Sequence, residues 1–466
     1  MVKQIKNAGL VAIVAAAFLV TSCRKEQSND GSGNYDRAAS AGFTNPTQSI
    51  AIDVNGVIQD NFDGNATDNI INLTSNKVWL IDGVSYVPSG KTLKIPAGSI
   101  LSSGAFKSYT ATEGGVTINK NIRGVLVVVK GAMLDAQGTE ALPIVFTSPN
   151  APGSRAAGDF GGVILLGDAD TNQPNTTVIE GLPTPPTGVD ITYGGSDNVD
   201  NSGILKYVRI EYPGLVLFAN NEINGLTLGG VGSGTTLNHI QVTYSADDSF
   251  EFFGGTVNAT YLVAAGGDDD DFDFDFGYTG TIQYAVGLKA LSSTHSTSGG
   301  VSDANGIESD NEKAAPYTNT PKTLPVLRNF TLLGTSSNNS VLKLGARFRR
   351  NTNFDIQNSV IGGYPNGVTT EDLATGTFSS NILHAYSATG AYTPASTASS
   401  ANTYLLLGTS GTPFYTDHST AYNVNTLIPR STSPIPATAG AVAKGTASGA
   451  TWLKNWTVFT TQTKVY

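Results

Sequence analysis

The stretch HIQVTYSADDSFEFFGG (residues 239–255) recurs without a gap, at an offset of 22, as YLVAAGGDDDDFDFDFG (residues 261–277). The matched pairs keep their acidic, aromatic or glycine character: Asp247/Asp269, Asp248/Asp270, Phe250/Phe272, Glu251/Asp273, Phe252/Phe274 and Gly255/Gly277. A further step of 21 places residues 261–266 on residues 282–287, and similar motifs at 358–361 and 381–383 lie about the same interval apart. The chain therefore contains an internal repeat with a period near 22.

A period of this length fits one coil of a parallel β-helix, made of three short strands and three turns. It is too short for a propeller blade, which takes about 40–45 residues, and the Leu-x-x-Leu-x-Leu signature of leucine-rich repeats is missing. Stacked coils place like residues on like, so each coil needs its neighbour to complete a core. We therefore expect an all-β, right-handed parallel β-helix, a solenoid with a coil period of about 22.

Short apolar runs ended by Gly, Asn or Asp recur through the body of the chain, and no window beyond residue 46 sustains a helical apolar pattern. We assign the β-helix to residues 47–390. The irregular intervals 104–123, 170–203 and 291–326 are expected to be loops that project from its turns. Residues 391–466 are expected to form C-terminal coils and a cap, with Trp452 and Trp456 covering the final coil.

The composition excludes several classes of protein. The chain has 466 residues, 37 Asp+Glu against 27 Lys+Arg, a net charge of −10, and 53 glycines. Few helix formers and many turn residues argue against a coiled coil or a helical bundle. The acidic balance argues against nucleic acid as the main partner.

The N-terminus has the order of an export signal. Lys3 and Lys6 precede an apolar run at residues 8–20, which is shorter than the ~20 residues that span a bilayer. Small residues then lead to Cys23, the single cysteine, in a pattern that resembles a bacterial lipobox. We expect residues 1–22 to be a lipoprotein signal peptide, Cys23 to be lipidated, and residues 23–46 to be a flexible tether.

Several segments resemble recurrent elements of bacterial extracellular β-helix proteins: residues 141–148, 158–167, 205–212 and 249–258. Together they resemble a family of Bacteroidota surface lipoproteins with a right-handed parallel β-helix, over roughly residues 78–390. Lys25-Glu26 resembles the charged sorting signals of such lipoproteins, although a solvated tether explains these charges equally well. The resemblance implies the fold and an outer-membrane, cell-surface location, and it assigns no catalytic residue.

The repeat brings many carboxylates together. In residues 271–276 Asp and Phe alternate, so we expect Asp271, Asp273 and Asp275 on one face of a strand and the phenylalanines on the other. The register of the repeat adds acids from the adjacent coil. We predict a Ca²⁺ site, because Ca²⁺ takes six to eight oxygen ligands and relieves the repulsion between carboxylates. Its candidate ligands are Asp247, Asp248, Glu251, Asp269, Asp270, Asp271, Asp273 and Asp275.

Two other interpretations of these carboxylates remain open. They could be solvated or neutralised by the basic cluster at residues 347–350. They could also perform catalysis, with Asp270 and Asp273 as the candidates, because glycoside hydrolysis needs a proton-donating carboxyl and a second carboxylate. The four histidines are scattered and show no metal-ligand spacing.

The expected function is binding without catalysis. Tyr212, Tyr244 and Tyr278 are candidate stacking platforms for sugar rings on the exposed faces of the coils. We expect an accessory lipoprotein that captures polysaccharide or another nutrient, with a TonB-dependent uptake complex or the polysaccharide itself as partner. The alternatives are a β-helix carbohydrate-active enzyme, either a lyase or a glycoside hydrolase, and a structural or adhesive surface protein.

Overall fold

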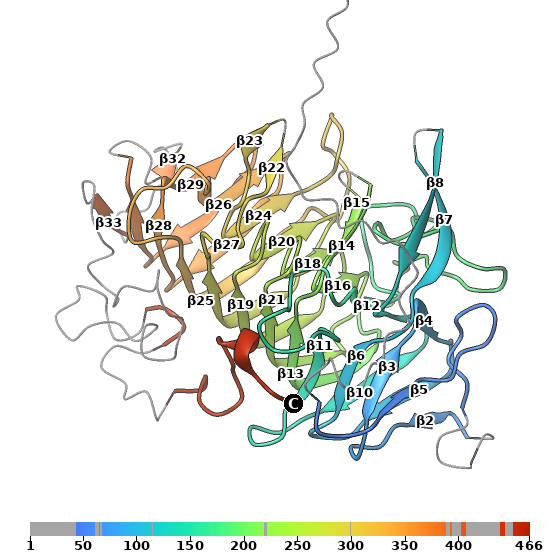
Figure 1. The fold of residues 1–466 in the computed structure, drawn as a ribbon. Coiled ribbons are helices and arrows are strands. Elements are labelled where there is room, and N and C mark those ends of the chain that lie inside the picture. The colour runs from blue at the N-terminus through green and yellow to red at the C-terminus, as the bar shows by residue number, and fades with distance from the viewer. Residues whose placement is uncertain are drawn as a thin grey trace, which may run out of the picture. The chain divides into compact units, whose positions relative to one another are not determined.

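The structure is a computed structural model that describes residues 43–60, 65, 68–113, 115–218, 221–298, 300–387, 392–393, 402–406, 439–442 and 451–466. The predicted signal peptide, Cys23 and the tether up to residue 42 lie outside the described residues. In the described part of the chain, two parallel sheets stack strand upon strand in a β-helix (Figure 1). The fold class expected from the repeat is therefore confirmed.

The larger sheet, sheet 1, has 17 described strands, and every pairing in it is parallel. They are β1 (Thr47–Ser49), β2 (Ile70–Asn72), β3 (Val78–Ile81), β5 (Thr92–Ile95), β6 (Ile100–Ser103), β10 (Met133–Gln137), β11 (Ile144–Thr147), β13 (Gly203–Glu211), β17 (Thr236–Thr243), β19 (Asn258–Ala265), β21 (Thr281–Leu288), β25 (Val326–Leu333), β27 (Asn353–Gln357), β28 (Val360–Tyr364), β30 (Thr375–Ser379), β31 (Ile382–Ala385) and β33 (Thr403–Leu406).

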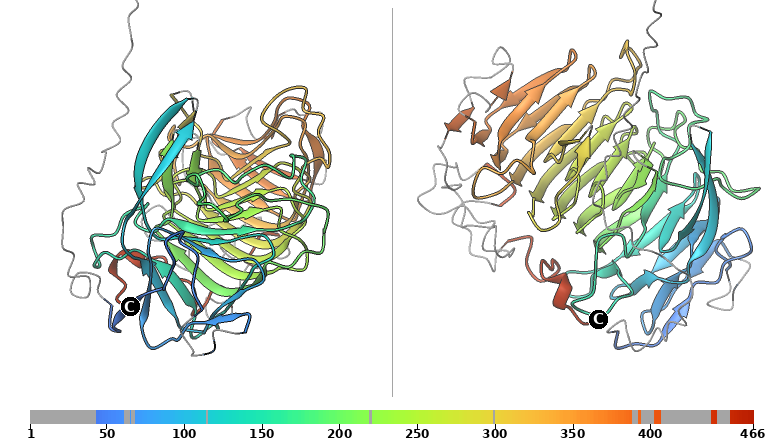
Figure 2. Two further views of the ribbon diagram at one scale, coloured as in Figure 1. Left: turned by 90° about the vertical axis from the view of Figure 1, so that its right-hand side faces the viewer. Right: turned by 45° about the horizontal axis from the view of Figure 1, so that its top comes forward.

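Sheet 2 has ten described strands, also parallel. They are β4 (Val84–Val87), β9 (Val125–Val128), β12 (Gly162–Leu166), β16 (Leu226–Gly229), β18 (Phe250–Phe253), β20 (Phe272–Asp275), β24 (Ile307–Asp310), β26 (Leu344–Arg349), β29 (Asn366–Thr370) and β32 (Tyr392–Thr393). Figure 2 shows the strands of both sheets stacked in chain order.

Within the described residues, three antiparallel hairpins project from the coils: β7 (Lys107–Glu113) with β8 (Val116–Ile122), β14 (Leu215–Phe218) with β15 (Asn221–Ile223), and β22 (Thr297–Ser298) with β23 (Val301–Ser302). A 3₁₀ helix covers Thr461–Thr463. A search of the described residues finds no helix with the length and apolar character needed to cross a membrane.

From β13 onward, sheet 1 bends once in each described coil, at a residue in the left-handed backbone region. Successive corner residues are Tyr207, His239, Tyr261 and Tyr284, with φ between 50° and 62°. Their rings stack on one another, with centroids 4.4, 4.4 and 5.2 Å apart along the row. Left-handed backbone is costly for a non-glycine residue, and the stacked rings offset part of that cost. Each coil therefore has three short strands, as the period predicts.

The register confirms the first step of the repeat and corrects the next one. Leu262 of β19 pairs with Ile240 of β17, an offset of 22, but with Ala285 of β21, an offset of 23. The expected step of 21 is therefore wrong at this point. The reason is the turn between the sheets, which covers residues 254–257 in one coil and residues 276–280 in the next.

Residues 291–326, expected to be a loop, contain a strand of the β-helix. β24 pairs in parallel with β20, as Phe272↔Ile307 and Asp273↔Glu308, and with β26 on its other side. The prediction missed this strand because the short run Ile307–Asp310 is flanked on both sides by polar loop sequence.

The described residues 451–466 of the C-terminal segment pack along the side of the β-helix. Trp452 and Trp456 contact the corner rings of His239 and Tyr261. Arg209 of β13 donates to the Trp456 carbonyl at 3.0 Å. Apolar residues of 439–442 and 451–459 cluster with outward-facing residues of sheet 1, among them Val263 and Val286. The predicted position of both tryptophans is therefore wrong.

Candidate functional site

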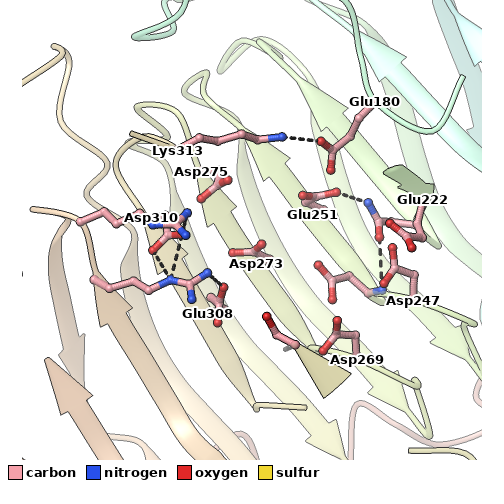
Figure 3. A pocket seen from close by; sticks show the side chains of 15 residues that line it. Glu180, Glu222, Asp247, Glu251, Asp269, Asp273, Asp275, Glu308, Asp310 and Lys313 are labelled. Carbon is pink, nitrogen blue, oxygen red and sulfur yellow. Dashed lines mark hydrogen bonds and ion pairs between the residues drawn. The ribbon is translucent and has the colours of Figure 1, made fainter. Parts of the chain in front are cut away.

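A cavity of about 390 Å³ lies over the outer face of sheet 2 (Figure 3). Ten carboxyl groups and three basic side chains line it, together with Asn224 and Ser298. The acidic residues are Glu180, Glu222, Asp247, Asp248, Glu251, Asp269, Asp273, Asp275, Glu308 and Asp310, and the basic ones are Lys313, Arg349 and Arg350. The cavity is therefore strongly acidic in its ionised state.

Strand alternation builds the floor of this cavity. The side chains of Phe250 and Phe272 point into the β-helix and stack with their centroids 5.3 Å apart, as do those of Phe252 and Phe274 at 5.1 Å. The residues between them therefore point outward. Glu251, Asp273 and Glu308 form one outward row on three successive coils, because they pair in register. Asp275 and Asp310 stand two residues further along β20 and β24.

The remaining acids of the repeat come from the turn that precedes each sheet 2 strand. Asp247 and Asp248 precede β18, and Asp269 precedes β20. Asp248 also belongs to a ladder that links four coils. Its backbone N–H donates to Asn224 Oδ1 at 3.2 Å, its Oδ1 accepts from the Asp270 N–H at 2.7 Å, and Asp270 Oδ1 accepts from the Asn305 N–H at 2.5 Å. This ladder fixes the turn that holds the acids.

Two groups of three carboxylates converge closely enough to share a cation. One is Asp247, Asp248 and Asp269, and the other is Asp248, Glu251 and Asp273. Within each group the three ligand atoms lie within 4.8 Å of one another. Ca²⁺–oxygen distances of about 2.3–2.6 Å put opposite ligands about 5 Å apart, so both groups fit this ion. Five of the eight predicted ligands are thus brought together.

Asp271 does not join the cluster. It is fully buried, and its carboxylate lies 3.3 Å from the ammonium of Lys289, which is also fully buried. The expectation that Asp271 shares a face with Asp273 and Asp275 is therefore wrong. The alternation fails here because Asp271 precedes β20 and turns toward Lys289, which follows β21. Burial raises the pKa of Asp271 to about 6, although Lys289 lowers it.

Asp270 also lies outside the lining of the cavity, since its carboxylate accepts the hydrogen bond from the Asn305 N–H in the ladder of turns. The structure therefore does not bring the two proposed catalytic carboxylates, Asp270 and Asp273, together in the cavity. Asp273 lines the cavity and Asp275 does so as well. Asp275 is 8 % exposed, and its Oδ1 is buried without a hydrogen-bond partner.

The basic cluster neutralises one end of the cavity. Arg349 contacts both Glu308 and Asp310, and Arg350 contacts Asp310 at 2.6 Å. Lys313 reaches Glu180 at 2.8 Å (Figure 3). These contacts engage acids that were not among the predicted ligands. The alternative of arginine pairing therefore applies to Glu308 and Asp310 at this end.

Burial shifts the acids of the cavity toward their neutral forms. It raises the pKa of Asp269 to about 7 and that of Glu308 to about 8. Burial, followed by repulsion from neighbouring carboxylates, raises the pKa values of Asp248, Glu251 and Asp273 well above their ordinary range. A group of carboxylates this close cannot all ionise without a compensating cation.

Two of the three predicted sugar-binding tyrosines are buried and have no free ring face. Tyr212 is 1 % exposed, stacks on Tyr244 with centroids 5.5 Å apart, and its hydroxyl is 2.6 Å from the Thr461 hydroxyl. Tyr278 is inaccessible, packs against both Phe252 and Phe274, and donates to the Val257 carbonyl. The prediction is wrong for both, since their rings stabilise the fold. Tyr244 is half-buried against Tyr212.

Four of the ten acidic residues that line the cavity were not predicted from the sequence: Glu180, Glu222, Glu308 and Asp310. For Glu308 and Asp310 a signal existed, because Ile307–Asp310 alternates apolar or small and acidic residues as Phe272–Asp275 does. Glu180 and Glu222 come from projecting segments outside the repeat, and nothing in the local sequence marks them.

Comparison with known proteins agrees with the coil geometry. Residues 64–457 match the pectate-lyase-like beta-helix domain family, which is most of the chain. No curated protein matches the sequence. The matched region contains both sheets from Ile70 onward and every residue that lines the acidic cavity. The chain belongs to the pectate-lyase-like beta-helix family.

Proposed function

We propose that the protein binds Ca²⁺ in the acidic cavity and uses the bound cation to hold a polysaccharide, without chemical turnover. Lipidated at Cys23, it acts at the outer membrane as a surface-exposed accessory of nutrient capture. Its expected partner is a TonB-dependent uptake complex. Nucleic acid is not a partner, given the acidic cavity and the net charge of −10.

The observation that carries the proposal is the excess of carboxylates over basic groups in one cavity. The three basic side chains contact Glu180, Glu308 and Asp310, none of which belongs to the two groups of converging carboxylates. Asp247, Asp248, Glu251, Asp269 and Asp273 supply the ligand atoms of those two groups. The unpartnered Oδ1 of Asp275 adds a buried oxygen in the same cavity that lacks a donor. A hard cation supplies the positive charge that this group of oxygens needs.

The coordination number of Ca²⁺ leaves positions on the bound ion at which a polysaccharide can bind. Each group offers one oxygen from each of three carboxylates, whereas Ca²⁺ takes six to eight oxygens. The remaining positions accept water, or hydroxyl and carboxylate oxygens of a sugar. Because the family takes its name from a likeness to pectate lyases, acidic polysaccharide is the first class of ligand to test.

A carbohydrate-active enzyme is the second candidate, because Asp273 and Glu308 pair in register within the cavity. Neighbouring strands lie about 4.8 Å apart, near the ~5–5.5 Å between carboxyl groups of retaining glycosidases. Lyase chemistry is less well supported. Glu308 and Asp310 raise the pKa of Arg349 above its ordinary value even though burial lowers it, which makes this arginine a poor base.

The test is a binding and turnover screen with the detergent-solubilised full chain on acidic and neutral polysaccharides, with Ca²⁺ or with chelator. We expect saturable, Ca²⁺-dependent binding, no new reducing ends and no unsaturated products. Asp273→Asn is expected to lose binding, and Asp135→Asn, on β10 outside the cavity, to keep it. Turnover lost in Asp273→Asn would instead support the enzyme, and binding unaffected by chelator would contradict the role of the cation.

The location is tested in the native host. Cys23→Ser is expected to release the protein from the membrane fraction. Purification from gently solubilised outer membrane is expected to bring a TonB-dependent channel in stoichiometric amount. Recovery of the lipidated protein alone would contradict the accessory role.

A further inference from the structure

We infer that the acidic cavity binds two Ca²⁺ ions as a pair, bridged by the carboxylate of Asp248. This inference rests on the proposed function for the presence of a cation, and it adds the number of ions and the residue that joins them. The observation behind it is that Asp248 is the single residue shared by the two groups of converging carboxylates.

The two groups are built from different parts of the fold. In the first, Asp247 and Asp269 come from equivalent turns of neighbouring coils. In the second, Glu251 and Asp273 come from β18 and β20, where they pair in register. Asp248 stands where turn and strand meet, one residue after Asp247 and three before Glu251. The two cations would therefore occupy separate positions, one over the turns and one over the strands.

Charge favours two ions over one. The five carboxylates of the two groups carry five negative charges when ionised, so a single divalent cation leaves three of them uncompensated in a partly enclosed space. Two cations leave one. The basic side chains contact other acids of the cavity, namely Glu180, Glu308 and Asp310.

Asp248 is held in place for this role. Its Oδ1 accepts from the Asp270 N–H at 2.7 Å, which fixes the carboxylate against the next coil. Ionised, it has about four lone-pair positions, so this hydrogen bond leaves enough of them to bind two cations. Glu251 is oriented in turn by the amide of Asn224, which donates to its Oε2.

A separate observation indicates that the cavity holds a ligand that supplies positive charge. Asp275 is more than nine-tenths buried, lines the cavity, and has an oxygen without a hydrogen-bond partner (Figure 3). It belongs to neither group of three. A buried carboxylate oxygen without a donor is costly, and cations in the same cavity, with the water that they order, would offset that cost.

The experiment counts Ca²⁺ ions bound to the detergent-solubilised full chain, by native mass spectrometry and by titration calorimetry. We expect two ions on the unsubstituted chain, one on Asp269→Asn and one on Asp273→Asn. Asp248→Asn is expected to bind none at the Ca²⁺ concentration that saturates the unsubstituted chain. Asp135→Asn, outside the cavity, is expected to bind two.

Asp248→Asn is a suitable variant because it is expected to fold as the unsubstituted chain does. Asparagine keeps the acceptor for the Asp270 N–H, and Asn224 already acts as the acceptor at the equivalent position of the preceding coil. Its thermal unfolding without Ca²⁺ serves as the check on folding.

The outcomes separate the two proposals. One ion on the unsubstituted chain would overturn the pair and leave the proposed Ca²⁺ site standing, whereas no bound ion would overturn both. Two ions on the unsubstituted chain with one retained by Asp248→Asn would overturn the bridge.

Discussion

Asp248 and Asp270 are joined across neighbouring coils by a hydrogen bond of 2.7 Å from the backbone N–H of Asp270 to Asp248 Oδ1. The same contact recurs one coil further, from the Asn305 N–H to Asp270 Oδ1. These two aspartates therefore act as acceptors for the turn, a role that asparagine performs at position 224 of the same ladder.

This ladder predicts opposite effects for two substitutions of Asp270. Asp270→Asn keeps an acceptor for the Asn305 N–H and is expected to leave stability nearly unchanged. Asp270→Ala leaves that buried N–H unsatisfied and is expected to cost about 1–3 kcal/mol. Urea unfolding of the two variants checks the prediction. Equal destabilisation by both would show that the carboxylate charge, and not the acceptor, is what the turn needs.

A second prediction separates Asp273 from Asp271. Ca²⁺ at about 100 times its Kd is expected to stabilise the protein by about 2.7 kcal/mol per site, and Asp273→Asn is expected to remove much of this gain. Asp271→Asn is expected to keep the gain, because Asp271 lies outside the cavity. It lowers the starting stability by about 3–5 kcal/mol, since the buried ammonium of Lys289 then loses its carboxylate.

Calorimetric scans of both variants with Ca²⁺ and with chelator provide the measurement. The unsubstituted chain is the reference for the shift in Tm, and Asp135→Asn controls for the loss of one carboxylate elsewhere. If Asp271→Asn removed the Ca²⁺ response while Asp273→Asn kept it, the assignment of the cavity residues would be wrong.

The difference between Asp271 and Asp273 also shows what the sequence can and cannot predict. The offset of 22 correctly pairs Glu251 with Asp273 and Phe252 with Phe274, because stacked coils repeat both register and side-chain direction. By sequence alone, Asp271 fits the same alternation of Asp and Phe. It departs because strand geometry begins at Phe272, and because Lys289, on a different strand connection, stabilises it inside the fold.

Other residues of the cavity also could not be predicted from the sequence. Glu180 and Glu222 reach the site from projecting segments, and their positions follow from long-range packing that no local pattern encodes. The prediction that Tyr212 binds sugar was wrong for a different reason. Tyr212 stands at a left-handed corner with φ of 58°, and its hydroxyl contacts Thr461 of the distant C-terminal segment, so an exposed strand position was the wrong assumption.

A third prediction concerns pH in the absence of Ca²⁺. Burial raises the pKa of Asp269 to about 7 from 3.8 and that of Glu308 to about 8 from 4.5. Between the unfolded and folded values the folded state binds more protons, so stability falls as pH rises. Burial lowers the pKa of His239 and His384 to about 4 from 6.5, so they remove stability only as pH falls below about 6.5.

The informative window therefore runs from pH about 6.5 to about 8, where the carboxylates change charge and the folded-state histidines do not. Without Ca²⁺, the free energy of unfolding is expected to fall across this window, by up to about 1.4 kcal/mol per pH unit for each titrating group, and Tm falls with it. Thermal scans at several pH values check this, with Asp269→Asn expected to flatten the decline. A Tm that rises across the window would contradict the direction of these shifts.

The last prediction concerns the C-terminal segment. Trp456 is fully buried in the apolar cluster outside sheet 1, and its indole N–H donates to the Trp452 carbonyl at 2.7 Å. Trp456→Ala is expected to cost about 3–5 kcal/mol, whereas Lys454→Ala, at an exposed position of the same segment, is expected to be nearly neutral. Chemical denaturation compares the two variants.

Hydrogen exchange then shows which strands lose amide protection in Trp456→Ala. Because the indole ring lies against the corners at Tyr207 and His239, β13 and β17 are expected to lose amide protection first. A cap over the last coil would instead protect β31 and β33, which pair with each other far along the chain. Loss of protection confined to those two strands would contradict lateral packing, because Trp456 would then stabilise the end of the β-helix and not its side.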